Sequence, residues 1–343
     1  MSDSSNSRRL DRRGFLGLGA GALAAAAAFE WGYKLSTRPC KSAPSNPFVA
    51  AGKPLLVAVE GEDLHAMLRA GIEALGGLDP LAKFGTEAIF RGNYVMSQPY
   101  PVTTAPEFVL AVADELKRAG VRKTSLFDSH GTRLSAGVEP EQILRRLGVL
   151  EKLTQGGVSV LARDFLDSDE FVFVRNPAWP IAKPVAVHRI LHEAPIVVSL
   201  PVVKRHAYVN FTCALKMHFG SVSMADRMLV HTKDLNGRSG LMQQRLVHFA
   251  DAVKPQLHIV DARAILARSG PGLGGGGAEV VPGVNKIILS GDMVAVDAYC
   301  ARLMAQHDET FTPDMIARQL RHAASIGLGN ADLDAVEVVE IRA

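Results

Sequence analysis

The residue types best suited to chemistry are concentrated in one stretch near the middle of the chain. His206 and Lys216 are separated by nine residues, Lys204 lies just before them, and His231 follows. Imidazole and amine groups transfer protons, an amine can bond covalently to a carbonyl, and imidazole nitrogen ligates transition metals. The stretch therefore predicts a site for proton transfer, metal ligation or covalent attachment. Each histidine taken alone is better explained as an ordinary core or surface residue, and only the cluster as a whole makes the two explanations equal.

A second polar segment, Asp128 to Arg133, follows the apolar strand-like run Lys123–Phe127. His130 in this segment is a candidate acid or base, and Arg133 is a candidate partner for a carboxylate or phosphate. The alternative is a turn that Asp128 and Ser129 stabilise through their own side chains.

Two aspartates follow other apolar runs and are candidate supporting residues of the site. Asp261 precedes the glycine-rich run 270–277, which lacks the Lys-Ser/Thr of a P-loop and opens no helix with GxGxxG, so a flexible loop explains it better. Asp292 precedes a helical pattern, and its alternative role is to cap that helix.

Short apolar runs alternate with amphipathic helical patterns along most of the chain. We predict strands at 55–59, 123–127, 196–200, 257–260 and 286–289, and helices at 63–75, 107–119 and 140–153. This alternation predicts an α/β fold with a parallel or mixed sheet covered by helices on both faces, in one domain or two intimate lobes. Ligands of such sheets collect beyond the carboxyl ends of the strands, where the polar segments lie.

The first 34 residues resemble a twin-arginine signal peptide. Arg12-Arg13-Gly14-Phe15-Leu16 opens a weakly apolar run, and Ala26–Ala28 supplies small residues for a signal peptidase. We predict a signal at 1–34, a linker at 35–53 and an α/β domain at 54–343. The signal predicts the twin-arginine translocase as a partner and a periplasmic or other extracytoplasmic location, and an uncleaved anchor is the alternative.

Composition excludes several classes of function. The 343 residues carry 38 Lys and Arg against 35 Asp and Glu, a net charge of +3, of which the signal contributes two charges, so there is no electrostatic case for nucleic acid. No later apolar segment is long enough to span a bilayer, so we expect no membrane attachment once the signal is cleaved.

The three cysteines, Cys40, Cys213 and Cys300, form no CxxC pattern. Their spacing does not decide whether Cys213 pairs with Cys300.

The segments between Pro54 and Arg342 resemble the domain of unknown function 362 family. The resemblance rests on Leu200–His206, on Ala214–Gly220, which is similar to the family's Ala-Leu-Lys-Asn-x-x-Gly, and on Asp292–Asp297 with Gly327–Gly329. Met217 stands where the family commonly has Asn, and Arg91 where it commonly has Lys. The family has no settled activity.

The stretch is also similar, more distantly, to nickel-pincer lactate racemases. These enzymes have a histidine, nine residues, a lysine that carries the cofactor covalently, and a later histidine that binds nickel. The resemblance implies that His206 and His130 are acid and base, that Lys216 holds the cofactor, and that His231 binds the metal. The Gly-rich residues before the racemase lysine are replaced here by Asn210–Cys213.

These observations together lead to one hypothesis and one alternative. The hypothesis is a metal- or cofactor-dependent enzyme, similar to a racemase or epimerase, that acts on a small anionic metabolite. Its candidate residues are catalytic His130, His206 and Lys216, binding residues Lys204, Arg133, Asp261 and Asp292, and the metal ligand His231. The alternative is a non-enzymatic periplasmic binding or accessory protein for metal or redox (iron–sulfur) systems.

Overall fold

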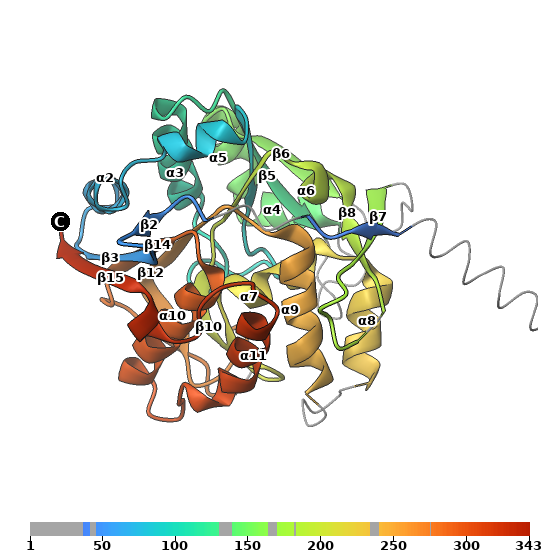
Figure 1. Ribbon diagram of the computed structural model, residues 1–343. Helices are drawn as coiled ribbons and strands as arrows, with labels where there is room; N and C mark the ends of the chain where they lie inside the picture. Colours follow the sequence, from blue (N-terminus) through green and yellow to red (C-terminus); the bar gives the residue numbers. More distant parts are fainter. Residues whose placement is uncertain are drawn as a thin grey trace, which may run out of the picture.

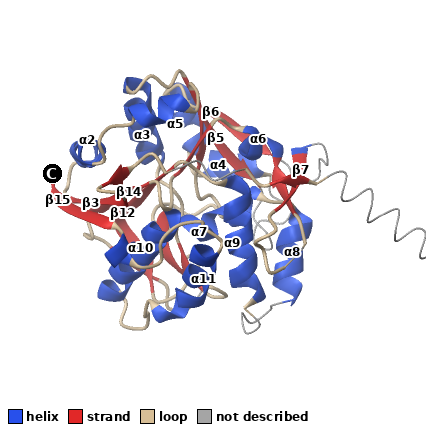
Figure 2. Cartoon of the chain, viewed as in Figure 1, coloured by secondary structure: helices blue, strands red, loops and turns tan. Residues whose placement is uncertain are grey.

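A large mixed sheet with helices on both faces organises the chain (Figures 1 and 2). The computed structural model describes residues 37–41, 46–129, 139–163, 170–181, 183–233, 240–274 and 276–343. The predicted α/β class with a mixed sheet is confirmed. No helix in these ranges is long and apolar enough to cross a membrane.

The described strands form one sheet of twelve strands and one of three. The path through the large sheet is β15 (Glu337–Arg342), β3 (Lys53–Glu60), β14 (Lys286–Ser290), β12 (Leu257–Ala267), β9 (Ile196–Ser199), β4 (Glu87–Arg91), β5 (Lys123–Ser129) and β6 (Ser159–Arg163). Off this path lie β2 (Val49–Ala50), β10 (Val202–His206), β11 (Asn210–Thr212) and β13 (Glu279–Val281). The small sheet consists of β1 (Arg38–Pro39), β7 (Phe171–Arg175) and β8 (Val185–His188).

Strand direction places the carboxyl ends of several strands at one edge. Strands β12, β9, β4, β5 and β6 are parallel to their neighbours in this order, whereas β14 is antiparallel to both β12 and β3. The parallel strands are covered on both faces, which explains why β9 is an unbroken buried run rather than an alternating one.

Helices cover the two faces of the sheet as two separate groups. On one face lie α2 (Leu64–Ala74), α3 (Pro106–Arg118), α4 (Pro140–Arg146) and α5 (Val149–Gln155). On the other lie α7 (Ala214–Met217), α9 (Leu241–Val253), α10 (Met293–His307) and α11 (Asp314–Ser325) (Figure 1). The remaining helices are α6 (Arg189–Glu193), α8 (Met224–Lys233), η1 (Asp79–Lys83), η3 (His218–Ser221) and η4 (Leu333–Ala335).

Successive strand residues alternate between the two cores. Val57 and Ile259 belong to the core beneath α2 and α3, whereas Leu56 and Val260 belong to the core beneath α10. Period-two alternation of side chains in a strand requires this division. The face that carries α7 to α11 also carries the candidate site.

The prediction of one helix over 140–153 was wrong in one respect. The chain forms two helices there, α4 and α5, because Gly148 between them adopts a left-handed conformation with φ 65°. The remaining predicted strands and helices are present, and β12 extends to Ala267, beyond its predicted end.

Candidate functional site

Lys204, His206, Lys216 and His231 form one group, which we call the cationic cluster. Strand β10 continues past the carboxyl end of β9, and the antiparallel strand β11 returns the chain to α7. This hairpin places Lys204 and His206 beside the helix that carries Lys216. The predicted convergence of these residues is therefore observed, and the electrostatic effects of Lys204, Lys216 and His231 on His206 reflect it.

A carboxylate from a distant helix fixes the start of α7. Asp297 of α10 is fully buried, and its Oδ1 accepts a hydrogen bond from the backbone N–H of Ala214 at 2.6 Å and a longer one from Leu215. An N-terminal carboxylate satisfies backbone donors that have no partner within the helix. The position of Lys216 is therefore set by α10, a role of Asp297 that its spacing in the sequence did not reveal.

The two lysines of the cluster have no acidic partner among the described residues. Lys204 is 1% exposed, and its Nζ donates to the carbonyl of Val102 at 2.6 Å. Lys216 Nζ lies 4.1 Å from the ring centroid of Phe219. Among the described residues, neither ammonium group has a carboxylate oxygen within 4.0 Å.

Burial and neighbouring charges lower the pKa of both lysines. Burial, followed by the charge of Lys216, lowers the pKa of Lys204 to about 7. Burial, followed by the charges of Arg227 and Arg91, lowers the pKa of Lys216 to about 7. Lys216 is partly exposed, and its Nζ lies over the ring of Phe219. Both amines are consequently poised between their two protonation states near neutral pH.

His206 is neutral and its tautomer is determined by the backbone. The N–H of Tyr208 donates to Nδ1 of His206 at 3.2 Å, so the proton of the neutral ring lies on Nε2. Burial, then the charges of Lys216, Lys204 and His231, lower the pKa of His206 well below its ordinary value. His206 can therefore offer an Nε2–H donor to a bound ligand.

Two aromatic rings join His231 to the rest of the cluster. The His231 ring packs edge-on against Phe219, with centroids 5.2 Å apart, and against Tyr208, with centroids 5.7 Å apart. Tyr208 also lies 6.0 Å from the ring of His206 and is 40% exposed. The cluster therefore has a buried side at Phe219 and a side facing solvent at Tyr208.

Behind the cluster, polar side chains from the ends of β4 and β5 form a second layer. Arg91 pairs with Asp128 at 3.0 Å, and Arg227 donates to Ser129 Oγ at 2.7 Å. Burial raises the pKa of Asp128 to about 6, although Arg91 and the backbone of Ser129 oppose the rise. The sequence analysis did not identify Arg227, because nothing in its spacing on α8 distinguishes it from a surface arginine.

Two of the other predicted site residues cannot be placed relative to the cluster, and Asp261 has partners of its own. His130 and Arg133 lie outside the described residues. The carboxylate of Asp261 is buried and bound by Arg263 at 2.7 Å and by the Tyr100 hydroxyl at 2.9 Å. Among the described residues, no group of three or more His, Cys, Asp or Glu is arranged to hold a metal ion, so the metal role of His231 stays a prediction.

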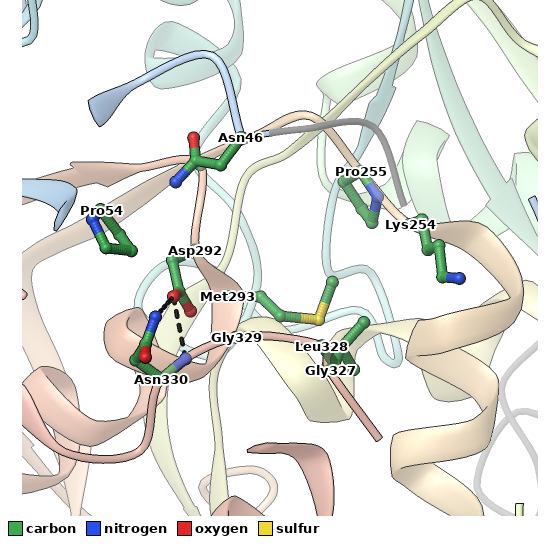
Figure 3. A pocket seen from close by; sticks show the side chains of 11 residues that line it. Asn46, Pro54, Lys254, Pro255, Asp292, Met293, Gly327, Leu328, Gly329 and Asn330 are labelled. Atoms are coloured by element: carbon green, nitrogen blue, oxygen red, sulfur yellow. Dashed lines mark hydrogen bonds between the residues drawn. The ribbon is translucent and has the colours of Figure 1, made fainter. Parts of the chain in front are cut away.

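Asp292 occupies a separate place, where it caps α10. Its Oδ1 accepts from the N–H groups of Val294 and Ala295. Its Oδ2 accepts from the backbone and side chain of Asn330 (Figure 3). It lines a hollow of about 300 Å³ together with residues 327–330. On β12, His258 pairs with Ser290 and Leu266 pairs with Lys204. These two positions on β12 are eight residues apart, which corresponds to roughly 25 Å along a strand.

Cys213 and Cys300 are buried free thiols that contact each other where α7 meets α10. Cys40 is also a free thiol, partly exposed.

Comparison with known proteins identifies relatives. A family model described as "Domain of unknown function (DUF362)" matches residues 91–302. A curated relative, thylakoid-associated protein sll1697 of Synechocystis sp. (strain PCC 6803), is 29% identical over 269 residues, covering 76% of this chain and 75% of that protein. A solved structure, the lactate racemase apoprotein of Thermoanaerobacterium thermosaccharolyticum, aligns with a TM-score of 0.45 and 11% identity. That alignment covers 67% of this chain, which spans only 55% of the racemase chain.

Proposed function

The chain belongs to the family described as domain of unknown function (DUF362), and because that description names no activity, we propose a function from the geometry of the site. The proposal is that the cationic cluster binds a small anionic molecule and that the protein is an enzyme that moves a proton on it. A metal or an organic cofactor is part of this proposal.

One observation carries the proposal: neither Lys204, which is buried, nor Lys216, which is partly exposed, has a carboxylate partner among the described residues. Burial of a cation costs free energy unless an opposite charge compensates for it. The lowered pKa values of Lys204 and Lys216 express this cost of holding a positive charge away from water, because each amine gives up its proton more easily than an exposed lysine does. An anionic ligand at the cluster would supply the missing partner and favour the charged form of Lys204.

The proposed roles follow from the protonation states. Neutral Lys216 would serve as base or nucleophile near neutral pH, where an amine with a pKa near 7 is half deprotonated. Neutral His206 would donate its Nε2–H to an oxygen of the ligand. Arg91 and Arg227 would add positive potential behind the ligand. His130 would be the second acid or base and Arg133 a carboxylate partner, as predicted from the sequence.

The residues of the cluster fit a cofactor that is bonded to an amine and ligated by an imidazole. Lys216 Nζ and the His231 ring both lie against Phe219, at 4.1 Å and 5.2 Å from its centroid. In this version of the proposal, Lys216 would hold the cofactor and His231 would bind its metal. Such a group, when bound, supplies an acceptor for the electron pair of a substrate C–H bond, which suits a racemase or epimerase.

We also propose that the protein works outside the cytoplasm after export by the twin-arginine translocase. This rests on the pattern at Arg12 and Arg13, which lies outside the described residues. Export in a folded state would allow a cofactor to be inserted before the protein crosses the membrane.

The test combines mass, metal content and anion binding of protein purified from its native compartment. Intact mass and elemental analysis would reveal an adduct at Lys216 and a stoichiometric metal, as the cofactor version requires. Thermal shift with lactate, malate and inorganic phosphate would reveal anion binding, since a ligand at 100 times its Kd stabilises by about 2.7 kcal/mol. We expect Lys216→Met to abolish the shift, whereas Lys123→Met, at a 60% exposed side chain, should leave it intact.

Two results would count against the proposal at different levels. An unmodified, metal-free protein that still binds anions would remove the cofactor and leave a cofactor-free enzyme or a binding protein. Equal thermal shifts in wild type and Lys216→Met would show that the cluster does not bind the anion.

A further inference from the structure

Exposed apolar side chains gather around the hairpin of β10 and β11, which carries part of the cationic cluster. Six large hydrophobic side chains are exposed among the described residues, and four of them lie on this hairpin or on segments that border it. Isolated exposed apolar residues are normal on a protein surface, whereas a group of them marks a place where something binds. The four are Tyr208, Leu273, Val280 and Met315, each between 37% and 45% exposed.

Two of the four lie on segments that are hydrogen-bonded to the hairpin. The side-chain amide of Asn210 on β11 donates to the carbonyl of Met315 at 3.4 Å. The N–H of Ala207, at the tip of the hairpin, donates to the carbonyl of Gly270 at 3.2 Å, three residues before Leu273. The start of α11 and the loop after β12 therefore border the hairpin.

The third segment reaches the hairpin through the sheet. Val280 of β13 pairs with Leu266 of β12, and Leu266 pairs in turn with Lys204 of β10. Segments that are far apart in the sequence thus bring exposed apolar side chains to the surroundings of one hairpin. We call these four residues, with Tyr208 at the tip, the apolar rim.

Tyr208 is the member of the apolar rim that contacts the cationic cluster. Its ring lies 6.0 Å from the ring of His206 and 5.7 Å from the ring of His231. Its backbone N–H donates to Nδ1 of His206, which fixes the tip of the hairpin beside the cluster. On the other side of His231 lies buried Phe219, which Lys216 Nζ also contacts. Aromatic rings therefore border the cluster on its buried side and on its solvent side.

This arrangement has the composition of a site for a molecule that is only partly polar. Sites for small molecules are lined mainly by apolar and aromatic side chains, with a few polar groups that fix the orientation of the ligand. An anionic group at Lys204 and Lys216 leaves the rest of the ligand on the solvent side of the cluster, where Tyr208 lies. A methyl group would cover little of that ring, whereas a larger apolar group would remove it from water.

We propose that the ligand of the cationic cluster is an anion with a bulky apolar or aromatic substituent, which packs against Tyr208. The anionic group lies at Lys204 and Lys216, and Tyr208 determines the preference for the substituent. This inference rests on the proposed function, because it requires the cluster to bind an anion. It goes further by naming the class of ligand and the residue that selects it.

The test compares lactate with phenyllactate, which share the hydroxycarboxylate group and differ in a methyl or a benzyl substituent. Dissociation constants are measured by isothermal titration calorimetry on protein purified from its native compartment. We expect phenyllactate to bind at least tenfold more tightly, which corresponds to about 1.4 kcal/mol. We also expect a more negative heat-capacity change for phenyllactate, because this quantity reports the burial of apolar surface on binding.

Three variants assign the preference to one ring. Tyr208→Ala should weaken phenyllactate at least fivefold more than lactate, whereas Tyr208→Phe, which keeps the ring, should retain the preference. Phe173→Ala is the matched control, since its ring is 45% exposed but lies on β7 of the three-stranded sheet. It should leave the ratio of the two constants unchanged. General damage to the protein would weaken both ligands together, so the ratio separates recognition from stability.

The possible failures are distinguishable. Equal affinities for lactate and phenyllactate in the wild type would overturn this inference and leave the proposed function in place. A preference for phenyllactate that persists in Tyr208→Ala would likewise overturn it, because the apolar group would then bind elsewhere. Absence of binding by either anion would overturn the inference together with the proposed function.

Discussion

The lowered pKa of Lys216 predicts a distinctive pH profile for its chemical modification. Amines react with acylating reagents only when neutral. At pH 8 an amine with a pKa of about 7 is about 90% neutral, whereas an exposed lysine with the model-peptide pKa of about 10.4 is about 0.4% neutral. Between pH 8 and pH 10 the exposed lysine therefore gains about 70-fold in rate, and Lys216 gains about a tenth.

The assay is pulse acetylation at pH 6 to 10, with site-specific yields read by peptide mass spectrometry. The shape of the profile, rather than its height, is the observable, because partial burial of Lys216 slows access equally at every pH. Exposed lysines of the same chain provide the comparison within each sample.

A charge substitution then tests the cause of the lowered pKa. Arg227→Met removes a neighbouring positive charge and should move the midpoint of the Lys216 profile to higher pH, though only part of the way to 10.5, since burial is the larger cause. A wild-type profile for Lys216 that keeps rising through pH 9 in parallel with the exposed lysines would refute the reasoning about the cationic cluster.

Three further predictions concern stability. Asp297→Ala should destabilise the protein by about 2–3 kcal/mol in urea unfolding, because it leaves buried N–H groups of α7 without an acceptor; Asp297→Asn, which keeps one acceptor oxygen, should lose less. Gly270→Ala should cost about 1–3 kcal/mol, since its Cβ would clash with the backbone carbonyl oxygen of Arg205, whereas Gly274→Ala, with open space around it, should stay within about 0.5 kcal/mol in the same measurement. Stability without ligand should rise from pH 7 to pH 10, because in that window Lys204 and Lys216 bind more protons in the unfolded chain than in the folded protein. The slope, at most about 1.4 kcal/mol per pH unit for each lysine, should shrink in Lys204→Met as measured by unfolding at several pH values.

Local patterns in the sequence were sufficient for most of the fold. The buried run Ile196–Ser199 predicts a strand because a parallel strand is covered on both faces, and Asp292 before an apolar helical pattern predicts a helix start. The exception at residues 140–153 has a local cause that could have been weighed, since Gly148 readily takes the left-handed conformation that ends α4.

The sequence by itself also determined which residues could be chemically active, because amines and imidazoles at a recurring spacing narrow the possibilities. It could not decide their protonation or their neighbours. The lowered pKa of Lys204 depends on burial and on Lys216, and the capping of α7 depends on Asp297, 83 residues from Ala214. Such effects arise from distances between segments far apart in the chain. Only the tertiary structure, which brings β10, α7 and α10 together and places Asp292 away from the cationic cluster, decides which candidates share a site.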